Sequence, residues 1–271
     1  MNALRTIILT ALVGAALTAA TVPVLAQAAP DYAALMADPG RSEADRANDK
    51  RRDPVKLLAF TGVRPGMTVL DMGAGGGYST DIIARAVGST GKVYAQNPPQ
   101  FAERMKDRLD QRIATLPAKN VTLVARPTDD PVPPDVRNLD LITFFFAYHD
   151  TTFQQVDRAQ MNKKMFDALK PGGSLVIADH AAKAGDGANV GRTLHRIEKD
   201  TLRKEVEAAG FRLVDEGTFL AHPEDDHTEN VNQRKVNIDE FVLRFEKRRA
   251  EGARHSVHVG FSRLKVSCWS S

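Results

Sequence analysis

A glycine-rich segment between a short apolar run and a helical pattern constrains this chain more than any other feature. The run Met67 to Met72 has the composition of a buried strand, and the turn pair Pro65-Gly66 precedes it. The segment Gly73 to Gly77 follows, and residues 79–87 then repeat apolar side chains with a helical period until Gly88. A strand, a glycine turn and a helix bring the backbone close to a ligand and direct free helix amides toward it.

The acidic residue of this segment lies before the glycines. Asp71 begins the pattern D-x-G-x-G-x-G, which ends at Gly77. A dinucleotide-binding fingerprint places its acid about twenty residues after the glycines, at the end of the next strand. The order found here therefore disfavours a nicotinamide cofactor.

Three segments together resemble the class I S-adenosylmethionine-dependent methyltransferases. The D-x-G-x-G-x-G pattern resembles the first motif of that family. Residues 166–177 resemble its helix, turn and fifth strand, and residues 207–211 resemble its last helix as it turns into the sixth strand. The chain from about residue 41 to residue 247 is also similar to a bacterial family of predicted methyltransferases with secretion signals. The resemblance implies S-adenosylmethionine as the cofactor.

Strand and helix patterns alternate along the chain. They predict a three-layer, doubly wound α/β fold with a mostly parallel seven-stranded sheet and an antiparallel last strand. The expected strands are residues 67–72, 92–97, 120–125, 139–146, 174–178, 212–220 and 240–245. We expect residues 54–247 to form this Rossmann-like methyltransferase domain and residues 248–271 to form a peripheral tail.

The N-terminus has the pattern of a secretory signal. Positive Met1 to Arg5 and apolar Thr6 to Ala20 precede the small-x-small triplet Ala26-Gln27-Ala28. We expect a signal peptide over residues 1–28 with cleavage after Ala28, or alternatively after Ala26, and a periplasmic or secreted protein. An uncleaved anchor is the other interpretation. Residues 29–53 form a charged arm, for which a helical flap over the cofactor and a solvated arm are equally supported.

Composition excludes several classes of partner and site. The chain has 271 residues and a net charge of +3, and its basic residues are scattered, which argues against nucleic acid. Membrane contact is expected only through the signal segment. Cys268 is the one cysteine, so an internal disulfide or a cysteine metal site is excluded.

The resemblance and the position of the strand ends predict the cofactor site. The glycine segment would hold the methionine half of the cofactor, and Asp129 or Asp130, after the third strand, would lie near the adenine. Most family members end the second strand with an acid that binds the ribose diol, whereas this chain has Gln96, followed by Asn97. The expected cofactor-binding residues are Asp71, Gly73, Ala74, Gly75, Gly77, Tyr78, Gln96, Asn97 and Asp129, with a loop cap or solvated charge as the alternative for Asp129.

The acceptor side is predicted after the fourth and fifth strands. His149, Asp150, His180 and His195 all lie there, the last at the expected start of the final long helix. A histidine can take a proton from an acceptor near neutral pH, and His149 is the preferred base. Asp150, Asp179 and His180 are similar to the metal-ligand positions of catechol-type O-methyltransferases, but the match is partial, and no metal is expected.

These observations favour methyl transfer from S-adenosylmethionine to an unidentified small-molecule acceptor. A protein that keeps the fold and binds S-adenosylmethionine or a related nucleoside without catalysis is the alternative. An NAD-dependent oxidoreductase is the third hypothesis.

Overall fold

The computed structural model describes residues 28–234 and 237–248. The expected signal peptide, apart from its last residue, lies outside the described residues, and so does the tail after residue 248, including Cys268. Within the described ranges, no helix combines the length and the apolar content needed to cross a membrane.

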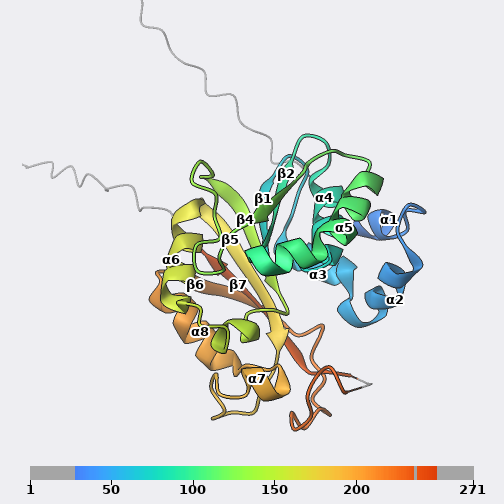
Figure 1. Ribbon diagram of the computed structural model, residues 1–271. Helices are drawn as coiled ribbons and strands as arrows, with labels where there is room; N and C mark the ends of the chain where they lie inside the picture. The colour runs from blue at the N-terminus through green and yellow to red at the C-terminus, as the bar shows by residue number, and fades with distance from the viewer. Residues whose placement is uncertain (1–27, 235–236, 249–271) are drawn as a thin grey trace, which may run out of the picture.

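A seven-stranded sheet with strand order β3-β2-β1-β4-β5-β7-β6 forms the centre of the molecule (Figure 1). Its strands are β1 Thr68–Met72, β2 Lys92–Asn97, β3 Val121–Ala125, β4 Leu139–Phe145, β5 Leu169–His180, β6 Arg212–Gly217 and β7 Glu240–Glu246. β1 to β5 are parallel to one another, and β7 pairs antiparallel with both β5 and β6. The predicted α/β architecture, including the antiparallel closing strand, is confirmed.

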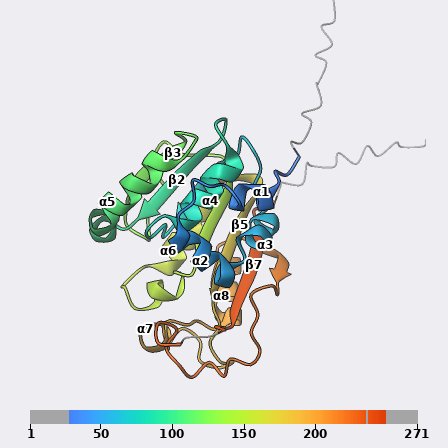
Figure 2. The same ribbon diagram turned by 90° about the vertical axis from the view of Figure 1, so that its right-hand side faces the viewer.

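Helices cover both faces of the sheet (Figures 1 and 2). The helices are α1 Tyr32–Met36, α2 Glu43–Arg52, α3 Pro54–Thr61, α4 Tyr78–Val87, α5 Pro99–Thr115, α6 Arg158–Ala168, α7 Gly191–Leu194 and α8 Lys199–Ala208, with a 3₁₀ turn, η1, at His149–Thr152. One apolar cluster joins the sheet to α3 and α4, and the other joins it to α6 and α8.

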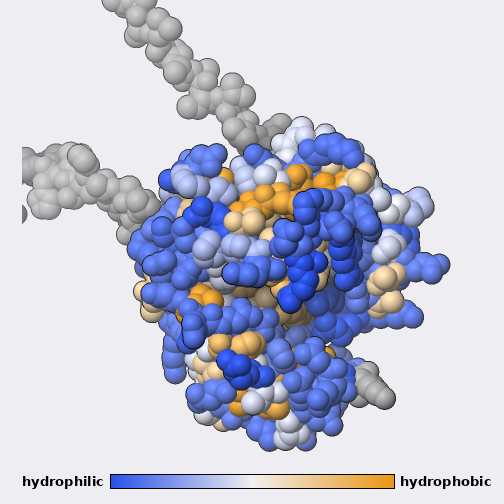
Figure 3. All heavy atoms as spheres, viewed as in Figure 1, coloured by the Kyte–Doolittle hydropathy of each residue, from blue (hydrophilic) through white to orange (hydrophobic). Residues whose placement is uncertain are grey.

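The central strands are apolar on both faces because each face has its own helical layer. Side chains alternate along β1, so that Val69 packs on the α3–α4 side and Leu70 on the α6–α8 side. β4 repeats the alternation with Leu141 and Ile142. Leu70 is fully buried, and its truncation to alanine would destabilise the fold by about 2–5 kcal/mol. The face of the molecule shown in Figure 3 is largely hydrophilic, with apolar side chains exposed in a band near its top and in a few smaller areas.

The charged N-terminal arm folds into α1 and α2 and packs beside the glycine segment. Asp45 pairs with Arg112 of α5 at 2.6 Å, and Arg112 also donates to the carbonyl of Gly76 at 2.9 Å. Asp49 accepts from Tyr78 Oη at 2.7 Å and pairs with Arg41. The arm's two buried charges, Arg41 and Asp45, are therefore both paired, which is why so charged a sequence still packs against the domain.

Three expected boundaries are wrong. β6 ends at Gly217 and not at residue 220. β5 is longer than residues 174–178, because Leu169 still pairs with Leu139 across a bulge. His195 does not open the last long helix: it ends the short helix α7 with a φ of 54°, and α8 begins only at Lys199. Arg196 lies between the two helices, where it is buried and forms an ion pair with Asp225 at 2.9 Å.

Candidate functional site

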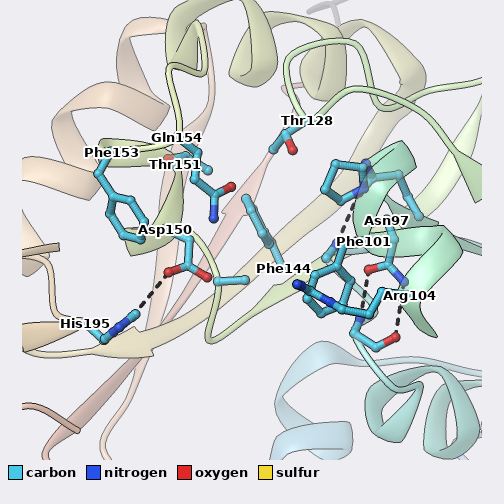
Figure 4. A pocket seen from close by; sticks show the side chains of 15 residues that line it. Asn97, Phe101, Arg104, Thr128, Phe144, Asp150, Thr151, Phe153, Gln154 and His195 are labelled. Atoms are coloured by element: carbon cyan, nitrogen blue, oxygen red, sulfur yellow. Dashed lines mark hydrogen bonds and ion pairs between the residues drawn. The ribbon is translucent and has the colours of Figure 1, made fainter. Parts of the chain in front are cut away.

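A cavity of about 340 Å³ opens at the carboxyl ends of β1, β2 and β4. Figure 4 shows Asp150, Phe153 and His195 on one side of it and Asn97, Phe101 and Arg104 on the other. The lining residues are Gly73, Gly75, Gln96, Asn97, Pro98, Phe101, Arg104, Thr128, Phe144, Ala147, Asp150, Thr151, Phe153, Gln154 and His195. The cavity thus lies where ligands of open α/β sheets bind.

Two glycines form one end of the cavity. Gly73 and Gly75 have φ values of 59° and 57°, a conformation that favours glycine. A Cβ atom on Gly73 would lie 3.2 Å from the Cβ of Ala147 and 3.2 Å from the Phe144 ring, both of which line the cavity. A Cβ on Gly75 would meet only the Gly73 carbonyl, at 3.8 Å. A side chain at either position would therefore occupy space that a ligand can use.

Asp71 lies under this loop and does not line the cavity. It is fully buried, and its carboxylate accepts hydrogen bonds from the hydroxyls of Thr80 at 2.6 Å, Ser79 at 2.8 Å and Thr143 at 2.9 Å. Burial raises the pKa of Asp71, and the three hydroxyls partly oppose this by stabilising the charge. Asp71 therefore ties β1 to α4 and β4 and fixes the loop from beneath.

The side chains at the end of β2 hold the loop from the side. The amide of Gly73 donates to Gln96 Oε1 at 3.1 Å, and Gln96 Nε2 donates to the carbonyl of Arg126 at 2.8 Å. Asn97 accepts from the amide of Gly75 at 2.9 Å and donates to its carbonyl at 3.1 Å. Both polar atoms of Gln96 are thus used inside the protein. Gln96 also lines the cavity, and its expected contact with the ribose diol remains a prediction.

The other expected cofactor residues lie outside the cavity lining. Ala74 is buried in the loop, and a Cβ on Gly77 would lie 2.8 Å from Leu109, so Gly77 allows α5 to pack closely. Tyr78 points to Asp49 of α2, and burial together with this carboxylate raises its pKa. Asp129 lines a neighbouring depression instead. Their expected contacts with the cofactor remain predictions.

The three expected histidines do gather at one edge, but they differ in environment. The rings of His149 and His180 are 5.4 Å apart, as are those of His149 and His195. Burial lowers the pKa of His180 to about 3, so it is neutral at pH 7. Of the three, His195 alone lines the cavity, together with Asp150, whose Oδ1 lies 3.3 Å from His195 Nδ1.

His149 is poorly suited to be the base that the sequence favours. Its Nδ1 lies 2.7 Å from Asp179 Oδ1, and its Nε2 lies 3.2 Å from Asp150 Oδ1. Burial alone would lower its pKa, but the charges and hydrogen bonds of Asp179 and Asp150 outweigh burial and raise the pKa to about 10. A histidine protonated at neutral pH cannot accept another proton. This geometry corrects the preference for His149.

Gly191, which the sequence analysis did not single out, brings His195 into place. A Cβ on Gly191 would lie 2.1 Å from Thr152 Oγ1 and 2.7 Å from the carbonyl of His149. Only glycine therefore lets α7 pack directly on η1. The only hint in the sequence is a glycine four residues before a histidine, which carries no meaning until the two segments are known to touch.

Comparison with known proteins identifies the family. Residues 69–173 match the family model described as a methyltransferase domain. The chain is 28% identical over 184 residues to the ubiquinone/menaquinone biosynthesis C-methyltransferase of Escherichia coli. The matched region covers 57% of this chain and 70% of that protein. This chain therefore contains a methyltransferase domain. Its cofactor is S-adenosylmethionine.

Solved structures support the fold of this methyltransferase. An S-adenosylmethionine-dependent methyltransferase from Aquifex aeolicus has a TM-score of 0.55 at 22% identity, covering 79% of this chain and 97% of that one. An arsenic(III) S-adenosylmethionine methyltransferase from Chlamydomonas reinhardtii has a TM-score of 0.54 at 16% identity, covering 83% and 75%. At these identities the likeness concerns the fold alone.

The residues of this methyltransferase fit its cofactor. Gly73 and Gly75 leave a cradle that a Cβ would fill, and the N-terminus of α4 directs amides and a positive dipole end toward an anionic group. Phe101, Phe144 and Phe153 give the cavity apolar walls. The sequence did not predict these aromatic walls, because their convergence depends on three separate connections.

Proposed function

We propose that this methyltransferase transfers the methyl group of S-adenosylmethionine to a small-molecule acceptor. A single observation carries the proposal: one cavity has the glycine loop at one end and the ionisable pair Asp150–His195 at the other. Its volume of about 340 Å³ is near the lower limit of small-molecule sites, which is about 300 Å³. Little room is left for an acceptor beside the cofactor, so a small acceptor fits best.

The protein's contribution to the reaction is position, exclusion of water and proton removal. The cofactor supplies a methyl group on a positively charged sulfur. The glycine loop, fixed by Asp71, Gln96 and Asn97, sets where the cofactor lies. The aromatic walls exclude water, and holding both reactants in line lowers the barrier. Asp150 and His195 are the acidic and imidazole groups of the lining, and they are placed to bind the acceptor and help remove its proton.

A non-catalytic binding protein is the second candidate, because one feature favours it. The end of β2 carries two neutral amides, and both are committed to the loop rather than to a ribose. Such a site offers no carboxylate to the ribose diol from this strand, and a neutral acceptor binds a hydroxyl less strongly than a charged one.

Titration calorimetry with S-adenosylmethionine, S-adenosylhomocysteine and NAD separates the three hypotheses. We expect the first two to bind and NAD not to bind. Incubation with panels of small hydroxyl, thiol and amine compounds should then release S-adenosylhomocysteine with at least one of them. Binding without turnover across the panels would favour the binding protein, and binding of NAD alone would favour the oxidoreductase.

We also propose that the protein works in the periplasm or outside the cell after cleavage behind Ala28. The positive start, the apolar run and the triplet Ala26-Gln27-Ala28 support this. N-terminal sequencing of the protein from its native host should begin at or within a few residues of Ala29. A sequence that begins at Met1 or Asn2 would contradict the proposal.

A further inference from the structure

Three side chains able to bind a metal ion converge at the acceptor end of the cavity. His149, Asp150 and His195 each offer one ligand atom, and within the described residues these atoms all lie within 4.8 Å of one another. They come from two segments: η1 supplies His149 and Asp150, and the end of α7 supplies His195. Gly191 provides the close packing that joins the segments.

Two of the three separations between these atoms match those of ligands on one ion. His149 Nε2 lies 3.2 Å and His195 Nδ1 lies 3.3 Å from the same atom, Asp150 Oδ1. Two ligands bound at about 2.1 Å to one cation, at angles between octahedral and tetrahedral, are about 3.0–3.4 Å apart. Both measured separations lie in that range.

A buried carboxylate supports the cluster from behind. Asp179 is fully buried, and its Oδ1 lies 2.7 Å from His149 Nδ1 while its Oδ2 accepts from the backbone amide of His149 at 2.8 Å. A carboxylate on one ring nitrogen fixes the imidazole's orientation and leaves the other nitrogen for a metal. In this arrangement Asp179 is a positioning residue, and Nε2, which faces Asp150, gives up its proton when it binds the metal ion.

We propose that His149, Asp150 and His195 form a binding site for one divalent transition-metal cation at the acceptor end of the cavity. Two imidazoles and one carboxylate suit Zn²⁺ and its neighbours, whereas Mg²⁺ and Ca²⁺ prefer oxygen ligands throughout. Three protein ligands leave at least one coordination position unfilled, as in catalytic zinc sites. Asp150 and His195 line the cavity, so that position faces the space left for the acceptor.

The site also defines an acceptor class, and this part rests on the proposed function. A hydroxyl or thiol on the acceptor can take the open position, where the cation lowers its pKa and its proton leaves to water. The acceptor's oxygen or sulfur then bonds to the methyl carbon. The carbon–sulfur bond of the cofactor breaks, and its electron pair returns to sulfur. The acceptor is therefore a small hydroxyl or thiol compound, not one that lacks such a group.

Metal titration of the untagged, chelator-treated chain tests the site directly. Calorimetry with Zn²⁺ should give one ion per chain, and Co²⁺ should produce a visible absorption band. Asp150→Asn and His195→Gln should each lower metal affinity by more than 100-fold. Asp179→Asn should lower it by about 10–100-fold, as expected for a residue that supports a ligand.

His227→Gln is the matched control. His227 Nε2 lies 2.9 Å from Asp239 Oδ2, so it also forms a partly buried histidine–carboxylate pair, but it is not part of the cluster. This variant should bind Zn²⁺ as the original chain does. Circular dichroism of every variant establishes that it has folded.

Specific outcomes overturn the proposal. The site is refuted by the absence of stoichiometric Zn²⁺ and Co²⁺ uptake, by unchanged affinity in Asp150→Asn and His195→Gln, or by equal loss in His227→Gln. Adding mercaptoethanol or ethylene glycol to the cobalt-loaded chain should shift the absorption band, and an unchanged band with both overturns the acceptor class. Calorimetry with S-adenosylmethionine is run on the same samples. Metal uptake without cofactor binding would contradict the proposed function and leave the metal site standing.

Discussion

Replacement of Gln96 by glutamate tests the internal role of this side chain. Gln96 is fully buried, and its Nε2 donates to the carbonyl of Arg126 at 2.8 Å. An ionised carboxylate at this position would place a charged oxygen against that carbonyl. A protonated carboxyl group keeps both contacts, because its hydroxyl donates to Arg126 and its other oxygen accepts from Gly73. The variant should therefore fold with the new carboxyl group neutral.

The free-energy cost of keeping the carboxyl group neutral sets how much stability Gln96→Glu loses. An unperturbed glutamate has a pKa of about 4.3, so holding it protonated at pH 7 costs up to about 3.7 kcal/mol, at about 1.36 kcal/mol per pH unit. The folded-state pKa is raised, so the variant reaches its full stability below about pH 4 and loses stability as the pH rises. Between pH 5 and pH 7 it should lose up to about 2.7 kcal/mol relative to the original chain.

Urea unfolding of both chains at pH 5, 6 and 7 measures this difference. Gln96→Met is the control: it removes both hydrogen bonds without adding a titratable group, so its loss of stability should not vary with pH. Cofactor affinity in Gln96→Glu should fall or stay unchanged. A Gln96→Glu chain that is as stable as the original at pH 7 and binds S-adenosylmethionine more tightly would show that this side chain faces the ribose after all.

Three further substitutions test the site's construction. Gly75→Val should abolish cofactor binding in calorimetry, because its side chain enters the cavity, whereas Gly62→Val carries the same positive-φ strain in open space and should still bind. Arg112→Met should lower the free energy of unfolding by about 3–5 kcal/mol, because it leaves the carboxylate of Asp45 buried without its cation. Gly191→Ala should fold but lose Zn²⁺ affinity, because the added methyl group separates α7 from η1.

Lys106 pairs with Asp110 on the exposed face of α5, so Lys106→Met should leave the free energy of unfolding nearly unchanged. If Arg112→Met lowers the free energy of unfolding no more than Lys106→Met does, the Asp45–Arg112 pair contributes no more than an exposed ion pair. Cofactor binding by Gly75→Val would show that the glycine loop is only a turn and does not hold the cofactor. Unchanged Zn²⁺ affinity in Gly191→Ala would show that α7 tolerates the displacement.

The Asp45–Arg112 contact also predicts a pH dependence. Burial alone would raise the pKa of Asp45, but the hydrogen bonds and charge of Arg112 outweigh it and hold the pKa below its usual value. The stability contributed by this pair is therefore fully present above the ordinary carboxylate pKa, and it is lost as the pH falls through the lowered one. Urea unfolding from pH 6 to pH 3 should show a loss that Arg112→Met lacks.

The fold could be predicted because its signals are local. The turn Pro65-Gly66, the apolar run of β1 and the glycines after it are contiguous, and each limits the backbone within a few residues. Boundaries were less certain where distant contacts decide them. His195 illustrates this: a helical pattern continues around it, yet the buried pair between Arg196 and Asp225 interrupts the helix.

The sequence by itself determined which edge of the sheet holds the site, because parallel strands place their carboxyl ends together. It brought Asp71, the glycines and the histidines to that edge. Only the tertiary structure decided which of them reach the cavity. Burial and pairing turn Asp71 away from the cavity, and Asp179 and Asp150 keep His149 charged, whereas His195 faces the cavity. These outcomes depend on partners many residues away, which no local pattern specifies.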